Sequence, residues 1–260
     1  MRDHRQEPER TGAAPSVTAA RDHRRSTGAH DTVGAVDIAQ DYTGHVDNGG
    51  AAVRRELGAL TVTKLSVGPM DNNAYLLTCR SSGEALLIDA ANDAERLLEL
   101  VGAGDDRPDL RTIVTTHRHG DHWQALGTLV GATGAQTVAH PTDAGGLPVQ
   151  PDVLVEHGGT VTVGDCPLEV IHLRGHTPGS IALLHRDEGG HPHLFTGDSL
   201  FPGGPGKTWS PEDFTSLVDD LEARVFGVLP DDTWFYPGHG DDSTIGAERA
   251  HLAEWRERGW

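Results

Sequence analysis

A cluster of possible metal ligands occupies the segment from Thr116 to His122, which reads Thr-His-Arg-His-Gly-Asp-His. Imidazole nitrogens and carboxylate oxygens both bind divalent transition metals. A single histidine here would be read as part of a polar loop, but three histidines and an aspartate within six positions favour a metal site. His117 and His119 are two positions apart, whereas Asp121 and His122 are adjacent. This spacing suggests two neighbouring metal ions, each completed by ligands from elsewhere in the chain.

The residues around the cluster predict a loop between a strand and a helix. Leu110 to Thr116 is rich in β-branched side chains, which is typical of a buried strand. Trp123 to Val130 carries apolar side chains at helical spacing, with Asp121 where a helix cap would lie. Ligands at the carboxyl end of a strand rest on a rigid platform, so we expect the site there.

Length and composition restrict the class of protein. The 260 residues suffice for one large domain or two small ones. No apolar run approaches the roughly 20 residues of a membrane helix, and the N-terminus lacks the apolar region of a signal peptide. Cys79 and Cys166 have no paired spacing, so they predict neither a disulfide framework nor a cysteine-based zinc site. We therefore expect a cytoplasmic protein with no membrane partner.

The net charge of −18 bears on the partner. An acidic chain repels a phosphate backbone, so the charge disfavours a nucleic-acid partner and favours a small-molecule substrate. The sequence leaves the oligomeric state open.

The first 58 residues differ in composition from the rest. They contain few large apolar side chains and show no sustained periodicity, so residues 1–58 are predicted to be a disordered N-terminal extension, with a possible short helix from Ala51 to Leu57. Residues 59–260 are predicted to form the folded domain. Their strand patterns alternate with helical ones, which supports an α/β or α+β fold in one domain. The principal predicted helices after the cluster are Pro211 to Phe226 and Thr244 to Arg256.

The pattern Thr-His-x-His-x-Asp-His resembles the signature of the metallo-β-lactamase superfamily. Three more segments match the family in the same order: Gly175 to Ser180, Thr196 to Phe201 and Tyr236 to Gly240. Together they resemble the branch that contains glyoxalase II, or hydroxyacylglutathione hydrolase, over about residues 60–260. The resemblance implies an α+β fold, the four-layer αββα sandwich of this superfamily.

The resemblance also implies a set of metal ligands. His117, His119, His176 and Asp198 would hold one metal; Asp121, His122, His239 and again Asp198 would hold the second, with the Asp198 carboxylate bridging the two. Nitrogen and carboxylate ligands suit zinc, iron and manganese, and we expect two zinc ions per chain. Many β-lactamases of this fold carry cysteine at the position of Asp198, so the aspartate favours a thioester hydrolase.

A glycine-rich segment after Asp198 suggests a substrate contact. Phe201 to Thr208 looks superficially like a phosphate-binding loop, but the glycine required five residues before Gly206 is replaced by Phe201. The comparison with glyoxalase II implies instead that Lys207, and Trp209 in place of a tyrosine, contact the thiol carrier of the substrate. The basic C-terminal helical region of glyoxalase II has no counterpart in the roughly twenty residues after His239, so the resemblance leaves the carrier open.

These observations predict a metal-dependent hydrolase of a small thioester, in which a hydroxide between two metals attacks the carbonyl. Asp121 and Asp198 would be the carboxylates of the catalytic site. One alternative is a persulfide dioxygenase with a single iron on His117, His176 and Asp198, and another is a lactonase. A non-catalytic metal-binding module is the least favoured, since every ligand position is filled.

Overall fold

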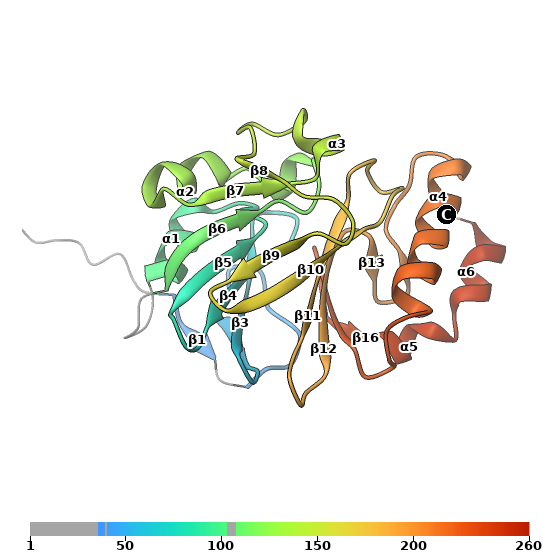
Figure 1. Cartoon of the computed structure of the whole chain (residues 1–260), viewed down its shortest axis with the longest axis horizontal. Coiled ribbons are helices and arrows are strands. Elements are labelled where there is room, and N and C mark those ends of the chain that lie inside the picture. The colour runs from blue at the N-terminus through green and yellow to red at the C-terminus, as the bar shows by residue number, and fades with distance from the viewer. Residues whose placement is uncertain (1–35, 40, 103–107, 260) are drawn as a thin grey trace, which may run out of the picture. The chain divides into compact units, whose positions relative to one another are not determined.

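A computed structural model describes residues 36–39, 41–102 and 108–259 (Figure 1). These residues form two β-sheets that pack face to face, with helices on the outer faces. The predicted α+β fold, a four-layer αββα sandwich, is confirmed. None of the helices among these residues is long and apolar enough to cross a membrane.

The first sheet has eight strands within the described residues, in chain order. They are β1 (Ile38–Ala39), β2 (Ala52–Glu56), β3 (Leu60–Val67), β4 (Asn72–Cys79), β5 (Glu84–Ile88), β6 (Asp109–Val114), β7 (Gln136–Ala139) and β8 (Val153–Leu154). Pairing is antiparallel from β2 to β5 and parallel from β5 to β8. The parallel strands place the carboxyl ends of β5 and β6 side by side, which matters for the site below.

The second sheet has six strands over the same described residues. In spatial order they are β16 (Ser243–Thr244), β15 (Trp234–Pro237), β12 (Pro192–Gly197), β11 (Ile181–Arg186), β10 (Cys166–His172) and β9 (Thr160–Val163). A small ribbon follows β12, formed by β13 (Leu200–Phe201) and β14 (Gly204–Pro205). The parallel pair β12 and β15 again brings two carboxyl ends together.

The helices cover the outer faces of the two sheets. On the first sheet lie α1 (Ala94–Gly102) and α2 (Leu126–Thr133), and on the second lie α4 (Pro211–Leu221), η2 (Glu222–Phe226), α5 (Ile245–Arg249) and α6 (Leu252–Arg258) (Figure 1). The short α3 (Pro141–Ala144) follows β7, and the 3₁₀ helix η1 (Gly120–His122) precedes α2. The predicted helix from Pro211 to Phe226 is confirmed as α4 with η2: Ser210 caps it by accepting from the Asp213 amide.

The central core lies between the sheets. Leu77 and Ile88 from the first sheet pack with Leu183, Phe195 and Tyr236 from the second, and all five are buried. The Phe195 and Tyr236 rings stack with their centroids 4.6 Å apart. This interior fixes the two sheets against each other, and therefore fixes the loops at their carboxyl ends.

The ordered fold starts earlier than the sequence indicated. The segment from Ala51 to Leu57 is not a helix: β2 pairs antiparallel with β3. Its charged residues fit a strand because they have partners on the folded domain; the Arg55 guanidinium lies 4.5 Å from the Trp234 ring centroid. The predicted boundary at residue 58 therefore falls inside the first sheet. The rest of the predicted extension, residues 1–35 and 40, lies outside the described residues.

The helix predicted from Trp123 to Val130 also begins later. The chain after the histidine cluster forms η1 and then α2, whose N-cap is Ala125 and which starts at Leu126. Asp121 is thus not a helix cap. It lies within η1, and its carboxylate faces the site described next.

Candidate metal centre

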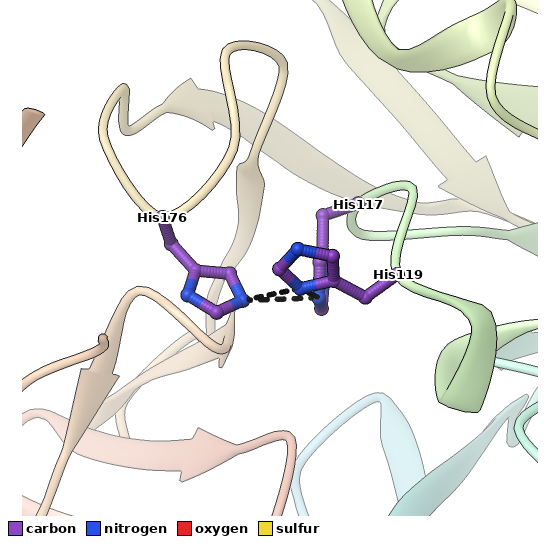
Figure 2. A group of neighbouring side chains, drawn as sticks. All are labelled: His117, His119 and His176. Atoms are coloured by element: carbon purple, nitrogen blue, oxygen red, sulfur yellow. Dashed lines mark hydrogen bonds between the residues drawn. The ribbon is translucent and has the colours of Figure 1, made fainter. Parts of the chain in front are cut away.

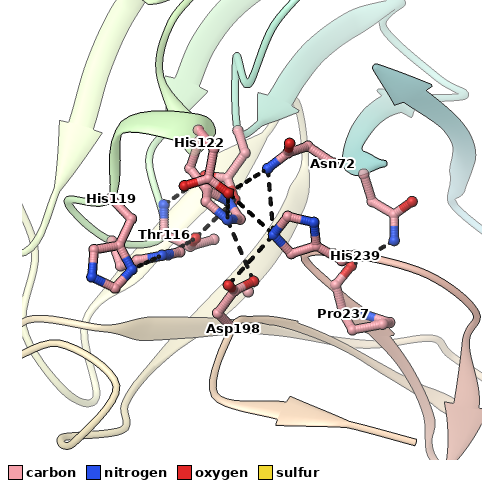
Figure 3. A network of polar contacts seen from close by, with 12 residues as sticks. Asn72, Thr116, His119, His122, Asp198, Pro237 and His239 are labelled. Atoms are coloured by element: carbon pink, nitrogen blue, oxygen red, sulfur yellow. Dashed lines mark hydrogen bonds and ion pairs between the residues drawn. The ribbon is translucent and has the colours of Figure 1, made fainter. Parts of the chain in front are cut away.

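Every predicted ligand lies in a segment that follows the carboxyl end of a strand. His117, His119, Asp121 and His122 follow β6, His176 follows β10, Asp198 follows β12 and His239 follows β15. The sandwich brings these loops to one place (Figures 2 and 3). The described residues contain three groups of side chains whose ligand atoms could hold a metal ion, and all three groups are drawn from the seven predicted residues.

The first half of the site consists of three histidines. His119 Nδ1 lies 3.1 Å from His117 Nε2 and 2.9 Å from His176 Nε2, and the last two nitrogens are 3.2 Å apart. Figure 2 shows His176 reaching across from its loop to the other two rings. Three ring nitrogens that converge on one point are suited to bind one face of a transition metal.

The second half of the site consists of Asp121, His122 and His239. Asp121 Oδ2 lies 3.2 Å from His239 Nε2 and 3.5 Å from His122 Nε2. Asn72 at the start of β4 donates from its side-chain amide to the same Asp121 oxygen, at 2.9 Å (Figure 3). The carboxylate is therefore oriented by an amide while it faces the two imidazoles.

Asp198 lies between the two halves. Its Oδ1 is 3.4 Å from His122 Nε2, while its Oδ2 is 3.5 Å from both His176 Nε2 and His239 Nε2. One carboxylate therefore lies beside histidines of both groups. Figure 3 shows its contacts with His122 and His239. This is the position that a bridging ligand requires.

Buried polar atoms without hydrogen bonds are a second reason why these residues fit metal ions. Among the described residues, His122 Nε2 and Asp198 Oδ1 are buried polar atoms that make no hydrogen bond. Leaving such atoms without a partner costs free energy, and a cation between them would satisfy both. The donor set of imidazole nitrogens and carboxylate oxygens matches a divalent transition metal.

A buried carboxylate that sequence reasoning missed orients His122. Asp89 Oδ2 lies 2.8 Å from His122 Nδ1 and accepts from the Thr116 hydroxyl at 2.8 Å, while Oδ1 accepts from the Thr116 amide at 2.8 Å. The contact through Nδ1 leaves His122 Nε2 facing the site. The available signal was topological: Asp89 directly follows β5, the parallel neighbour of β6.

Backbone carbonyls orient two further histidines in the same way. His176 Nδ1 lies 2.7 Å from the Lys207 carbonyl oxygen, and His239 Nδ1 lies 2.8 Å from the Met70 carbonyl oxygen. In each ring the outward nitrogen is the donor, so Nε2 is free to bind a cation.

Asp143 forms hydrogen bonds with two of the loops that carry the predicted ligands. Its carboxylate accepts from the Arg118 amide at 3.1 Å, in the loop of His117 and His119. It also accepts from the Gly179 amide at 2.9 Å and the Thr177 hydroxyl at 2.5 Å, in the loop of His176. A Cβ at Gly179 would lie 2.7 Å from the Asp143 backbone nitrogen, so the glycine permits this close approach. No pattern in the sequence indicated this residue's role.

Burial and charge divide the histidines into two kinds. Burial lowers the pKa of His117, His119 and His176, which favours the neutral form that binds metals. Burial acts in the same direction on His122 and His239, but nearby carboxylates outweigh it. They raise the pKa of His122 well above its usual value and that of His239 to about 9. The second half of the site is thus a concentration of negative charge that a cation would neutralise.

The two predicted substrate contacts lie beside the centre. Lys207 lines a cavity of about 330 Å³ together with His176, Asp198 and the segment 201–206. The Lys207 Nζ lies 4.4 Å from the Trp209 ring centroid, and the Trp209 ring is 6.4 Å from that of His119. Trp209 is 66% exposed, which is unusual for so large an apolar side chain. A cation and an exposed ring therefore stand at the edge of the site.

Comparisons with known proteins agree with this architecture. Residues 67–239 match the family model described as "Metallo-beta-lactamase superfamily". A hydroxyacylglutathione hydrolase from Polaromonas sp. is 36% identical over 169 residues, which cover 65% of this chain and 62% of that protein. The chain thus spans less than two thirds of that relative's length.

Two solved structures resemble the fold closely. ETHE1 from Myxococcus xanthus has a TM-score of 0.66 and 30% identity, over 75% of this chain and 84% of that one. TTHA1623, solved in a di-iron-bound form, has a TM-score of 0.57 and 31% identity, over 71% of this chain and 96% of that one.

Proposed function

Because the chain belongs to the metallo-β-lactamase superfamily, we propose that it is a metal-dependent hydrolase whose substrate is a small thioester. Two zinc ions are the proposed cofactors, held by His117, His119, His176 and Asp198 on one side and by Asp121, His122, His239 and Asp198 on the other. The structure of TTHA1623, which binds two irons, supports two metals at such a site, although it differs in the element.

The observation that carries this proposal is the position of Asp198. Its two oxygens face histidines of both ligand groups, and Oδ1 makes no hydrogen bond although it is buried. A carboxylate with only a structural role would be expected to have its buried oxygens satisfied by hydrogen bonds. Two divalent cations bound here would lower the pKa of a water toward 7 and polarise a substrate carbonyl.

The side chains around the centre define what the protein itself contributes. Asn72, Asp89 and the Lys207 and Met70 carbonyls hold the ligand side chains in fixed orientations, so little reorganisation is needed during the reaction. A thiolate, with a thiol pKa of about 8.5, leaves without a dedicated general acid. This property makes a thioester a better match to the site than an amide.

Lys207 and Trp209 support a carboxylate-bearing thiol carrier. The ammonium of Lys207 would pair with a carboxylate, and the exposed face of Trp209 would cover an apolar part of the carrier. The similarity to a hydroxyacylglutathione hydrolase supports the thioester class. Since the chain spans 62% of that relative, the carrier could be glutathione or another small thiol.

The test combines elemental analysis of the purified protein with a panel of thioesters and lactones. We expect about two zinc ions per chain and turnover of thioesters. His119→Ala and Asp198→Ala should each lose activity by several orders of magnitude with an unchanged circular dichroism spectrum, whereas the exposed His157→Ala should not change activity.

Other outcomes would redirect the assignment. About one iron per chain and oxygen consumption with a persulfide would indicate a dioxygenase. Turnover of lactones but not thioesters would indicate a lactonase. Bound metal with turnover of neither class would leave a metal-binding module.

A further inference from the structure

The two cysteines of the chain meet across the interface of the two sheets. Cys79 is the last residue of β4 in the first sheet, and Cys166 is the first residue of β10 in the second. Both are free thiols, 1% and 4% exposed, and their sulfur atoms are 3.8 Å apart. They are 87 positions apart in the sequence, so only the fold brings them together.

The surrounding turns are shaped to permit this contact. Cys79 leads into the exposed turn of the β4–β5 hairpin, and Cys166 follows the turn of the β9–β10 hairpin. Gly164, in the second turn, has a φ of +53°, and a Cβ there would lie 2.9 Å from Cys79 Sγ. The Ser81 hydroxyl lies 3.1 Å from Cys79 Sγ. The thiol pair therefore sits directly under two hairpin tips, where a small oxidant needs only local motion to reach it.

We propose that Cys79 and Cys166 form a reversible disulfide when the protein meets a peroxide, and that this bond ties the two sheets together. The sulfurs must approach from 3.8 Å to a bond length of about 2.05 Å. Because each cysteine lies at the hairpin end of its strand, the required shift is shared between two short turns.

The chemistry needs a peroxide as the oxidant and two steps. The Cys79 thiolate attacks one peroxide oxygen, the O–O bond breaks, and a sulfenic acid forms while the other oxygen leaves as water or an alcohol. The Cys166 sulfur then attacks the sulfenic sulfur, the S–S bond forms, and the S–OH oxygen leaves as water. The two thiols lose two electrons and two protons in total, and the peroxide is reduced.

The two sulfurs have different environments that suit these roles. Burial acts to raise the pKa of Cys79, but hydrogen bonds from Ser81 and Ser82 outweigh it and lower the pKa to about 6. Burial, with the neighbouring Cys79, raises the pKa of Cys166 to about 12. Cys79 is thus the sulfur that reacts first, and Cys166 the one that resolves the intermediate.

The position of the pair predicts what the bond would do. Asn72, which contacts Asp121 in the metal centre, begins β4, and Cys79 ends it. Seven residue steps along the strand, each of about 3.3 Å, separate them by about 23 Å. The disulfide would therefore close a long loop of the unfolded chain and stabilise the fold while leaving the metal centre unchanged.

The experiment treats the full-length, metal-loaded protein with a small excess of hydrogen peroxide. We expect the loss of both thiols titrated after denaturation, a mass decrease of two hydrogen atoms, and a melting temperature raised by several degrees, all reversed by dithiothreitol. Turnover and metal content should not change. The variant Cys166→Ala should show no rise in melting temperature, and its Cys79 should be labelled by a sulfenic-acid reagent.

Three results would overturn the proposal. In the first, both thiols survive the treatment. In the second, either cysteine gains the mass of oxygen atoms without loss of hydrogen. In the third, a non-reducing gel shows a disulfide between two chains. The variant Cys79→Ala is a second check, because the high pKa of Cys166 leaves it without a reactive thiolate. In this variant a sulfenic-acid label on Cys166 as strong as that on Cys79 in Cys166→Ala would also contradict the assigned order.

Discussion

Asp89 Oδ2 and His122 Nδ1 lie 2.8 Å apart, and both side chains are almost wholly buried. The same carboxylate accepts two hydrogen bonds from Thr116, the residue that precedes the first ligand His117. One aspartate therefore orients the ring of a proposed metal ligand, His122, and also holds the start of the loop that carries His117. Its contribution to the metal centre is indirect, through the orientation of His122.

Replacing Asp89 with asparagine tests this relationship. The introduced NH2 group would stand either in place of Oδ2, against the Thr116 hydroxyl and the His122 Nδ1–H, or in place of Oδ1, against the Thr116 amide. In both cases a buried donor would lose its partner. We expect Asp89→Asn to weaken metal binding by about 10- to 100-fold, measured by competition with a chromophoric chelator. Asp109→Asn, an exposed carboxylate at the start of β6, is the matched control and should bind metal as the wild type does. Unchanged affinity in Asp89→Asn would mean that His122 is held by other contacts.

The residues that cluster at the candidate site could be predicted because each motif is local. His117, His119, Asp121 and His122 lie within six residues, and the turns that carry His176 and His239 contain glycines close to the ligand. A strand followed by such a turn was enough to place each ligand at a strand end. The structure brings all seven predicted residues into one centre.

The supporting residues could not be predicted because their roles depend on which strands become neighbours. Asp89 acts on His122 only because β5 lies parallel to β6, with Ile88 opposite Val114. Asp143 sits in the short helix α3 and acts on two loops that are far from it in sequence. Neither residue stands in a local pattern that distinguishes it from a surface carboxylate.

The start of the fold could not be predicted from the sequence for a related reason. The β2 sequence Ala-Val-Arg-Arg-Glu is too polar to read as a strand, and its alternation is short. Pairing with β3 and the packing of Arg55 on Trp234 supply the stabilisation that local propensity does not. Tertiary contacts therefore determine whether such a segment forms a strand.

A buried lysine links the N-terminal segment to the loop of His239. Lys64 Nζ donates to the Gly44 and Gly240 carbonyls, at 2.8 and 2.7 Å, and lies 2.8 Å from Asp242 Oδ1. Neither the Lys64 nor the Asp242 side chain is exposed. Lys64→Met would leave a buried carboxylate without its cation, so we expect a loss of about 3–5 kcal/mol in the free energy of unfolding, measured by urea denaturation.

The paired replacement separates the ion pair from general packing. In Lys64→Met with Asp242→Leu, both charges are absent, and much of the lost stability should return. Lys207→Met, at an exposed lysine, should leave the unfolding free energy unchanged. If the double variant were as unstable as the single one, the carbonyl hydrogen bonds rather than the charges would be the main contribution of Lys64.

The Arg174–Asp220 contact should make stability depend on pH in a defined window. Burial acts to raise the pKa of Asp220, but hydrogen bonds from Arg174, with Nε and Nη2 at 2.8 and 2.7 Å, outweigh it and lower the pKa. A carboxyl whose folded pKa is depressed stabilises the fold above its unfolded pKa of about 3.9, and this contribution disappears as pH falls through the folded value.

We therefore compare the wild type with Arg174→Gln by chemical denaturation across pH. The wild type should be more stable by about 1 kcal/mol at pH 7, a modest value because the Arg174 side chain is half-exposed. The difference should shrink as the pH falls below about 4. Arg186→Gln removes an exposed pair with Glu169 and should show no measurable difference at any pH. If the difference in unfolding free energy between the wild type and Arg174→Gln did not change with pH, Arg174 would act by packing alone.

The Lys207 side chain should contribute to substrate affinity, provided that the protein has the proposed thioesterase activity. The Lys207 backbone carbonyl holds His176, whereas the side chain lies over the Trp209 ring, so a side-chain replacement need not disturb the metal centre. Lys207→Met should raise KM about tenfold for a thioester whose carrier bears a carboxylate, with kcat unchanged, because a charge-assisted contact of about 1.4 kcal/mol is lost. For a neutral thioester KM should stay the same.

Two further variants distinguish charge from contact area. Lys207→Arg keeps the charge and should retain most of the affinity for the carboxylate-bearing substrate. Trp209→Ala removes an apolar face and should raise KM for both substrates. An equal rise in KM for both substrates in Lys207→Met would exclude carboxylate recognition, since a lost ion pair affects only the charged carrier. It would leave Lys207 as a support for the Trp209 ring.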